Sequence, residues 1–146
     1  MPSTEVRTYN PDRVTVIVGG APMQGFGEDT FVEIAPLADI VTSKAGADGE
    51  VARSIGTDRR HTVTITLMQT SPSNDVLSGL AKADQLTCGG AAFPILVQDL
   101  CGRTMFMAAS AWVSQMPTQT FGREVNERQW QITTGAPTIN LVGGNQ

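Results

Sequence analysis

The sequence has little charge, few aromatic side chains and no long apolar run. Charged residues make up 16% of the 146 positions, well below the usual quarter, so the polar surface must come mainly from Thr, Ser, Gln and Asn. A surface so poor in charge indicates that partners cover much of it, and homo-oligomerisation is the simplest hypothesis. Aromatic residues are only 5%, which leaves the core to Val, Ile, Leu, Met and Ala.

Basic clusters are missing as well. The net charge is −4, and no group of Lys and Arg is dense enough to hold a phosphate backbone, which argues against specific nucleic-acid binding. No segment approaches the roughly 20 apolar residues of a membrane helix. The polar N-terminus lacks the apolar core of a signal peptide. We therefore expect no membrane anchor and synthesis in a reducing cytoplasm.

Patterns that bind metals or cofactors are also absent. The two cysteines, Cys88 and Cys101, and the single histidine do not have the spacing of a four-ligand zinc site, and whether the cysteines ever pair stays open. No D-x-D-x-D-G calcium loop occurs. The glycine pairs end a strand or a helix and lack the G-K-[ST] of a phosphate loop. We predict no cofactor and no metal site.

The stretch 58–75, DRRHTVTITLMQTSPSND, holds His61 among arginines, acids and hydroxyls. A catalytic histidine needs an orienting carboxylate and a nucleophile or a metal. Asp58 would lie on the other face of a strand, and Ser71 and Ser73 fit the start of a helix. We therefore predict no catalytic residue, and interpret His61 as a strand-edge histidine on a polar surface rich in arginine.

Residues 61–68 form the clearest predicted strand because apolar and β-branched polar residues alternate. One face carries Val63, Ile65 and Leu67. The other carries Thr62, Thr64, Thr66 and Met68. Such alternation is typical of an antiparallel sheet with a single buried side.

The hydrophobic period then changes from two to 3.6 residues, which predicts a helix over about 72–87. Ser71 or Ser73 is expected to cap its start, with a proline in the first turn. Gly89-Gly90 is expected to end it. Gly79 in mid-helix costs about 1 kcal/mol relative to Ala, so we expect another element to pack closely there.

Further strands are predicted on both sides of this helix, at 13–18, 30–35, 39–43, 92–98, 103–116, 128–133 and within 138–142. The long run 103–116 is apolar on both faces, and simple alternation groups Phe106, Ala108 and Trp112 on one of them. Its length predicts a bend or a crossing between layers. Residues 44–57 lack a periodic apolar pattern and predict a long exposed loop or hairpin.

Strands, one helix and then more strands predict a mainly β fold. We expect an antiparallel barrel or sandwich with one flanking helix. The chain shows no internal repeat and no dividing linker, so we expect one domain over residues 1–146. Its ends, at about 1–10 and 143–146, are expected to be flexible.

Several segments together resemble the tail tube proteins of contractile-tailed bacteriophages, which are phage structural proteins. They are 14–18 (VTVIV), 25–26 (GF), 46–53 (GADGEVAR), 60–75 (RHTVTITLMQTSPSND) and 111–112 (AW), spread over about residues 12–133. The resemblance implies a β-barrel or sandwich with a flanking helix, related in fold to type VI secretion tube proteins. It further implies hexameric rings, stacked into a tube around a channel for DNA delivery.

The resemblance also implies partners and a place in the virion. Subunits would bind one another, with the contractile sheath, baseplate and tape-measure proteins as further partners. DNA would pass through the lumen without specific binding. The protein would reside in the phage tail after assembly in the host cytoplasm.

Two surfaces are expected to matter for such an assembly. An exposed hairpin suits a contact between rings or subunits, with the charged residues Lys44, Asp48, Glu50 and Arg53 as hypothetical contacts. A lumen requires a lining poor in Lys and Arg, on which phosphates would stall. We therefore hypothesise that the polar strand face with Thr62, Thr64 and Thr66 faces solvent or the lumen, while the opposite face packs on the helix.

Two alternatives stay open. A tube-initiator or baseplate ring subunit of the same fold would differ in copy number, with one ring per virion. A small ligand-binding or hydrolytic β-barrel would lose its activity on His61→Ala and stay monomeric. The tube hypothesis instead predicts that His61→Ala matters little and that deleting Lys44 to Arg53 abolishes polymerisation.

Overall fold

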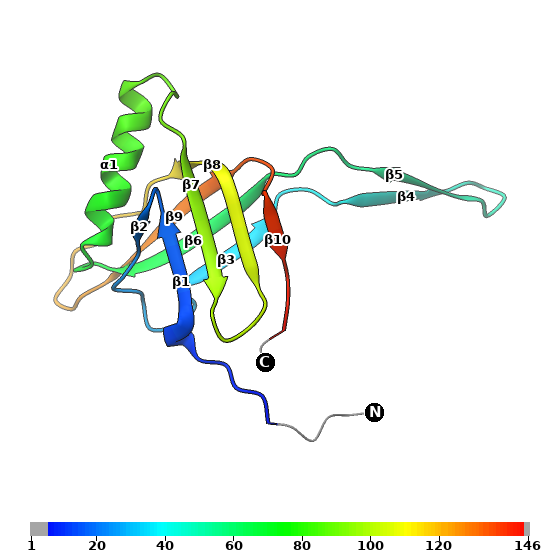
Figure 1. Ribbon diagram of the computed structural model, residues 1–146. Helices are drawn as coiled ribbons and strands as arrows, with labels where there is room; N and C mark the ends of the chain where they lie inside the picture. Colours follow the sequence, from blue (N-terminus) through cyan, green and yellow to red (C-terminus); the bar gives the residue numbers. More distant parts are fainter. Residues whose placement is uncertain (1–5, 145–146) are drawn as a thin grey trace.

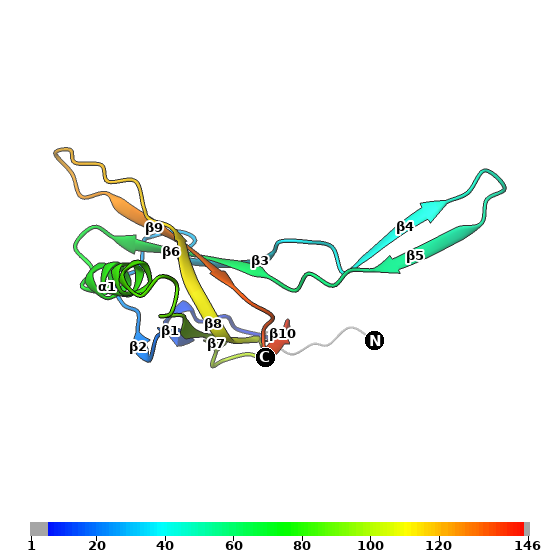
Figure 2. The same ribbon diagram turned by 90° about the horizontal axis from the view of Figure 1, so that it is seen from above.

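A computed structural model describes residues 6–144 and shows two antiparallel layers of strands with one flanking helix (Figures 1 and 2). The eight-stranded sheet has the order β2-β1-β7-β8-β9-β6-β3, and β10 also pairs with β8. Its strands are β1 (Val14–Val18), β2 (Ala21–Pro22), β3 (Val32–Pro36), β6 (His61–Met68), β7 (Phe93–Asp99), β8 (Met105–Gln115), β9 (Glu127–Thr134) and β10 (Ile139–Leu141). A short 3-10 helix, Pro11–Arg13, precedes β1. The mainly β prediction is confirmed, as a sandwich of layers.

Strand β8 belongs to both layers, which explains its length. Figure 2 shows β1, β7 and β10 below, and β9, β6 and β3 above, with β8 crossing from one to the other. Along one edge β8 pairs with β7; along the other it pairs first with β10 and then with β9. The predicted crossing between layers is therefore confirmed.

A bulge in β8 changes which side chains face the core. Phe93 pairs with Ala111 while Ile95 pairs with Ala108, so β8 has one extra residue in this interval. Because an extra residue reverses the alternation, Ala111 is buried with Phe106 and Ala108, and Trp112 is only half-buried. The grouping of Trp112 with Phe106 and Ala108 was wrong for this reason.

The core lies between the two layers and is mainly aliphatic, with three aromatic members, Phe93, Phe106 and Trp130. Its buried members are Val16, Val18, Met23, Val63, Ile65, Leu67, Leu77, Phe93, Ile95, Val97, Phe106, Ala108, Ala111, Trp130 and Ile132. Helix α1 (Ser73–Leu86) contributes Leu77. It covers the end of the sandwich opposite the hairpin formed by β4 (Val41–Ala45) and β5 (Val51–Ile55). The predicted inward face of the 61–68 strand is therefore confirmed.

Both ends of α1 differ in detail from the prediction. Pro72 is the N-cap residue, and no side chain caps the helix from that position. The helix ends in a Schellman motif, in which the Gly89 N–H donates to the Asp84 carbonyl. Cys88 occupies the left-handed position (φ 55°) that usually holds glycine. A Cβ on Gly79 would meet nothing within 4 Å, so close packing within the subunit does not explain that residue.

The two serines predicted as caps instead join the helix start to the segment after β2. The Ser71 hydroxyl donates to the Gln24 carbonyl and accepts the Ser73 N–H at 3.2 Å. The Ser73 hydroxyl accepts the Gln24 N–H at 2.9 Å. Gln24 thus has both of its backbone groups bound by serines that lie almost fifty residues away in the sequence.

Gly25 lies against this junction and requires the absence of a side chain. Its φ is +72°, and an added Cβ would lie 2.7 Å from the Ser71 Cβ. We expect Gly25→Ala to destabilise the protein by about 2–4 kcal/mol, the sum of left-handed strain and crowding. Gly20→Ala is the matched control, because Gly20 has φ +84° but open space around it. In chemical denaturation Gly20→Ala should cost about 1–2 kcal/mol, and equal losses for the two variants would contradict the crowding.

The remaining predicted strands are present with shifted bounds. The predicted strand 39–43 is β4 (Val41–Ala45), and it pairs with β5 (Val51–Ile55) in a separate two-stranded sheet. At the C-terminus, the Gly143 and Gly144 carbonyls accept from the Thr104 hydroxyl and the Arg103 N–H. That the chain is flexible at about 1–10 and 143–146 stays a prediction. Residues 1–5 and 145–146 of the predicted flexible ends lie outside the described residues.

Candidate functional site

The β4–β5 hairpin projects away from the rest of the chain (Figures 1 and 2). All ten residues of its two strands are exposed, and the strands pair only with each other. A two-stranded hairpin of this kind is marginally stable at best in water. An element that leaves every side chain uncovered in its own subunit is suited to contact another molecule. The predicted long exposed hairpin at about 44–57 thus lies at 41–55.

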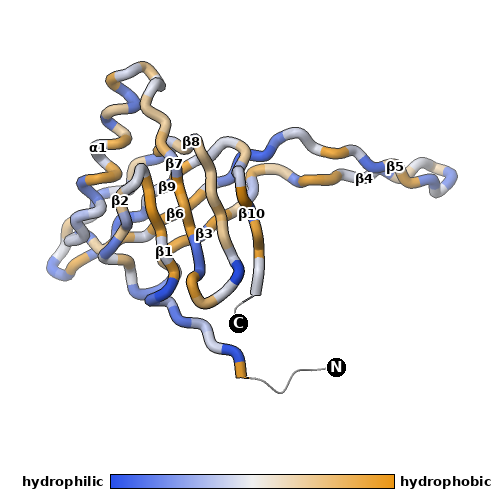
Figure 3. The backbone as a smooth tube through the Cα atoms, viewed as in Figure 1, coloured by the Kyte–Doolittle hydropathy of each residue, from blue (hydrophilic) through white to orange (hydrophobic). Residues whose placement is uncertain are grey.

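The two faces of the hairpin differ in chemistry. Cross-strand partners share a face, so one face carries the pairs Val41–Ile55, Ser43–Arg53 and Ala45–Val51. Val51 and Ile55 are 64% and 68% exposed, and we call this the apolar hairpin face. The other face carries the pairs Thr42–Ser54 and Lys44–Ala52. Figure 3 shows apolar residues toward the ends of the two strands, with polar residues between them.

The predicted contact residues fall at three different places on this hairpin. Arg53 lies on the apolar hairpin face and Lys44 on the polar one. Asp48 and Glu50 lie at the tip, where the Asp48 carboxylate accepts the Glu50 N–H at 3.1 Å. Gly49 provides the positive φ of 88° in this turn. The structure therefore does not gather the four charged side chains into one cluster.

The hairpin base holds the one ion pair found among residues 6–144. The Asp58 carboxylate accepts three side-chain hydrogen bonds from Nε and Nη2 of Arg60, the shortest at 2.8 Å. These bonds and the Arg60 N–H lower the pKa of Asp58 to about 2. The same pair raises the pKa of Arg60. Asp58 thus stays ionised well below its usual range, and it is committed to Arg60 and not to His61.

His61 is buried, which corrects its placement on a polar surface. Its ring is 8% exposed and lies 5.3 Å from the Phe106 ring. Nδ1 lies 2.9 Å from the Arg59 carbonyl, and Nε2 lies 3.2 Å from the Asn140 amide nitrogen. A carbonyl can only accept, so these partners fit a ring with its proton on Nδ1. The prediction that His61→Ala matters little assumed an exposed side chain. Because the side chain is buried and packs on Phe106, we expect the substitution to lower the stability of the fold.

Asn74 connects the helix start to the core, and sequence analysis missed it. Its amide nitrogen donates to the carbonyls of Met68 and Ser71, at 3.0 Å in both cases. Its Oδ1 accepts the indole N–H of the buried Trp130 at 2.9 Å. The side chain uses both amide hydrogens and its oxygen, so the TSPSND stretch is a structural joint. The one sequence feature that could have indicated this role is an Asn in the first turn of the predicted helix.

The outer face of the β3-β6-β9 layer carries the predicted threonines. Thr62, Thr64 and Thr66 are half-buried and lie opposite Thr133, Gln131 and Gln129 of β9. On the other side Thr64 lies opposite Glu33 of β3. Every strand residue that the register places on this face between His61 and Met68 is uncharged or acidic. We call it the threonine–glutamine face.

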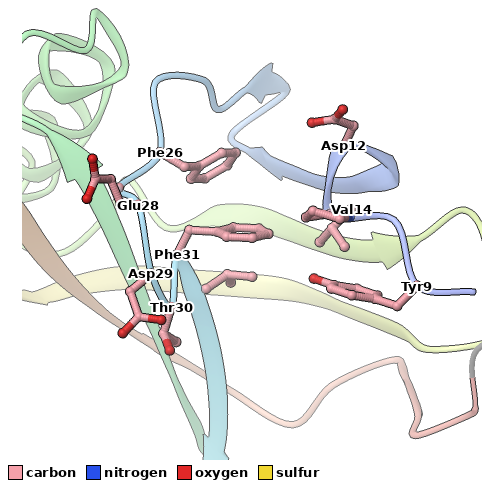
Figure 4. A pocket seen from close by; sticks show the side chains of 11 residues that line it. Tyr9, Asp12, Val14, Phe26, Glu28, Asp29, Thr30 and Phe31 are labelled. Atoms are coloured by element: carbon pink, nitrogen blue, oxygen red, sulfur yellow. The ribbon is translucent and has the colours of Figure 1, made fainter.

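A second exposed site lies between the start of β1 and the start of β3. Its volume is about 540 Å³, and Figure 4 shows Phe26, Phe31 and Tyr9 inside it, with the carboxylates of Asp12, Glu28 and Asp29 around it. The Phe26 and Phe31 rings lie 4.9 Å apart. We call it the acidic aromatic pocket. Sequence analysis missed it because it joins residues 9–14 to residues 26–32.

Other functional groups of the chain do not form a site in the described range. Cys88 and Cys101 are free thiols. Within residues 6–144, no three His, Cys, Asp or Glu side chains are grouped so that they could hold a metal ion. Nor does any helix in that range have the length and apolarity to cross a membrane.

Comparisons with known proteins identify the family of this chain. The model of the bacteriophage PhiTE tail tube protein family matches residues 13–142. The structural protein ORF10 of Pseudomonas phage KPP10 is 32% identical over 146 residues, covering 95% of this chain and 84% of that protein.

Solved structures of contractile injection systems share the fold at low sequence identity. The tube-terminating cap of the anti-feeding prophage has a TM-score of 0.63 at 13% identity, and the match covers 94% of each chain. A PVC sheath/tube terminator has a TM-score of 0.64 at 13% identity, covering 92% of this chain and 97% of that one. A PVC sheath-tube complex has a TM-score of 0.62 at 11% identity, covering 95% and 93%.

These matches favour a structural protein over a small hydrolytic or ligand-binding barrel. The family match spans most of the chain, and the relative from phage KPP10 is itself a structural protein. A projecting hairpin with an uncovered apolar face suits a subunit of an assembly. The chain therefore belongs to the bacteriophage PhiTE tail tube protein family, and it is a phage tail structural protein of the virion.

Proposed function

We propose that this protein polymerises as stacked hexameric rings into a tail tube, the channel through which DNA leaves the virion. The observation that carries the proposal is the β4–β5 hairpin, whose ten strand residues have no cover in their own subunit. A ring needs head-to-tail contacts between unlike surfaces, and stacking of rings then gives a filament. In this proposal the hairpin bridges neighbouring subunits of successive rings, with Lys44, Asp48, Glu50 and Arg53 as contact residues.

The threonine–glutamine face is the proposed lumen wall. DNA passes most freely along a wall without Lys or Arg, because bound phosphates would hold it. Hydroxyl and amide side chains from β6 and β9, together with Glu33, give such a wall. The opposite face of this layer is the core and cannot line a channel. Of the two faces of β6, the one that carries Thr62, Thr64 and Thr66 is therefore the proposed lumen wall.

The partners follow from this arrangement. The outside of the tube would contact the contractile sheath, and the tube ends would contact baseplate proteins. A tape-measure protein would occupy the lumen before DNA does. Assembly would take place in the host cytoplasm.

Electron microscopy of the purified protein at high concentration tests the proposal. We expect rings with six-fold symmetry and tubes built from them. A protein that stays monomeric in multi-angle light scattering, and shows no rings or tubes, would contradict it.

An initiator or terminator ring of the same fold is the second candidate. The structures that share the fold include both tube and terminator proteins, with TM-scores between 0.62 and 0.64, so the fold does not separate the roles. Copy number in the virion does. Quantitative mass spectrometry should find many rings per particle for a tube protein and a single ring for an initiator.

A further inference from the structure

The apolar hairpin face exposes three neighbouring side chains of β5, two aliphatic ones with an arginine between them. Val51, Arg53 and Ile55 alternate along β5 and therefore point the same way, and Val41 lies opposite Ile55. The two apolar neighbours of Arg53 on this face are about two-thirds exposed. A site that covers them must offer an apolar surface and also accept a guanidinium group between two aliphatic side chains.

The acidic aromatic pocket offers this combination. Its inner surface is formed by Phe26, Phe31 and Tyr9, and its rim carries Asp12, Glu28 and Asp29 (Figure 4). None of the residues that line it is a Lys or an Arg. None of the three carboxylates has an ion-pair partner among residues 6–144. Figure 4 shows these carboxylates at the edge of the pocket, pointing outward from the aromatic rings. Carboxylates without an ion-pair partner at the edge of an aromatic surface favour Arg, which pairs with carboxylates and stacks on rings.

The pocket and the hairpin lie at opposite ends of the same strand. The pocket includes Val32, the first residue of β3, and the hairpin leaves the body of the protein after Pro36, the last residue of β3. Figures 1 and 2 show the hairpin continuing beyond the end of β3. A hairpin therefore points away from the pocket of its own subunit, and a head-to-tail stack brings it toward the pocket of the next subunit.

We propose that the acidic aromatic pocket receives the apolar hairpin face of a second copy of this chain. In the complex Arg53 of one copy pairs with the rim carboxylates of the other, and Val51 and Ile55 pack on the aromatic side chains. This inference rests on the proposed polymerisation and names its docking site. Lys44 does not take part, since it projects from the polar face between Thr42 and the tip.

Charge exchange in the purified full-length protein tests the inference. We expect Arg53→Glu to lower the number of tubes at least tenfold in electron micrographs, because it places an acid beside three carboxylates. Lys44→Glu is the matched control, with the same charge change on the same hairpin, and should leave tubes near the wild-type level. The double variant Arg53→Glu with Asp29→Arg should restore tubes. Circular dichroism should show unchanged folding in all variants, since Lys44, Arg53 and Asp29 are exposed.

Cross-linking locates the contact. In a background with Cys88→Ser and Cys101→Ser, tubes of the Ser43→Cys, Thr30→Cys variant should give a ladder of multimers on oxidation, because Ser43 lies opposite Arg53 on the apolar hairpin face and Thr30 lines the pocket. This variant keeps Arg53 and the three carboxylates. The Lys44→Cys, Thr30→Cys variant should give no ladder. An Arg53→Glu variant that forms tubes like Lys44→Glu overturns the inference. So does a missing ladder in tubes that carry the Ser43 and Thr30 cysteines.

The inference and the proposed function fail in different ways. Wild-type protein that forms no rings or tubes contradicts the proposed function. Wild-type tubes that do not depend on Arg53 leave the proposed function intact and exclude only this docking site.

Discussion

Deletion of Lys44 to Arg53 is expected to abolish tubes while leaving the subunit folded. The hairpin contributes no side chain to the buried core, so its loss should hardly change the melting temperature. The same loss removes Ala45, Val51 and Arg53 from the apolar hairpin face, which a second copy must cover in the proposed tube. We expect a monomer or isolated rings in light scattering and electron micrographs, where the wild-type protein gives tubes.

Single substitutions on the two hairpin faces make a sharper version of this experiment. Val51→Ser and Ile55→Ser each remove an exposed aliphatic side chain from the apolar hairpin face, and we expect both to reduce tube formation. Thr42→Ala and Ser54→Ala change the opposite face and serve as matched controls that should still polymerise. Tubes of normal length from the deletion variant would show that the hairpin is not an assembly element.

Asn74→Ala is expected to be among the most destabilising single substitutions in this chain. It leaves the indole N–H of Trp130, which is 2% exposed, without its partner, and removes one of the two donors from each of the Met68 and Ser71 carbonyls. A buried donor without a partner costs about 1–3 kcal/mol, so we expect a total loss of about 2–4 kcal/mol. For a chain of this size the melting temperature should fall by roughly 5–15 °C, measured by circular dichroism or calorimetry.

Two further variants separate the hydrogen bond from other effects of Asn74→Ala. Ser78→Ala changes an exposed residue one helical turn further on and should shift the melting temperature by very little. Trp130→Phe removes the indole donor, so Asn74→Ala should cost less in that background than in the wild type. Additive losses in the double variant would show that the Asn74–Trp130 bond does not stabilise the fold.

Local patterns predicted the elements whose burial depends on one periodicity. In β6 strict alternation placed Val63, Ile65 and Leu67 in the core, and the change of period placed a helix directly after it. The helix ends close to the predicted residue, although Cys88 and not a glycine takes the left-handed position after it. These features follow from short-range geometry, because a pleated strand and a helix each repeat their buried face at a fixed interval.

Predictions failed where a distant segment decides the environment. The bulge in β8 arises from pairing with β7, and it is the reason that Ala111 rather than Trp112 is buried. His61 was expected at the surface, yet Phe106 and Asn140 cover it from positions at least 45 residues away. Gly79 has open space around it in the subunit, so contacts within the subunit do not explain why a glycine stands in this helix.

The candidate site was predicted only in part, for the same reason. An exposed hairpin near Lys44 to Arg53 follows from the weak apolar pattern of that segment, but its two faces depend on the pairing of β4 with β5. The acidic aromatic pocket could not be predicted, since it forms only when residues before β1 meet those before β3.

By itself, the sequence determined a mainly β chain with one helix, a projecting hairpin and a resemblance to phage tail tubes. Only the tertiary structure decided which faces are free for partners. That choice rests on strand order and register, which are long-range pairings between segments whose own sequences allow either face to be buried. The apolar hairpin face and the acidic aromatic pocket are exposed because no other part of residues 6–144 covers them.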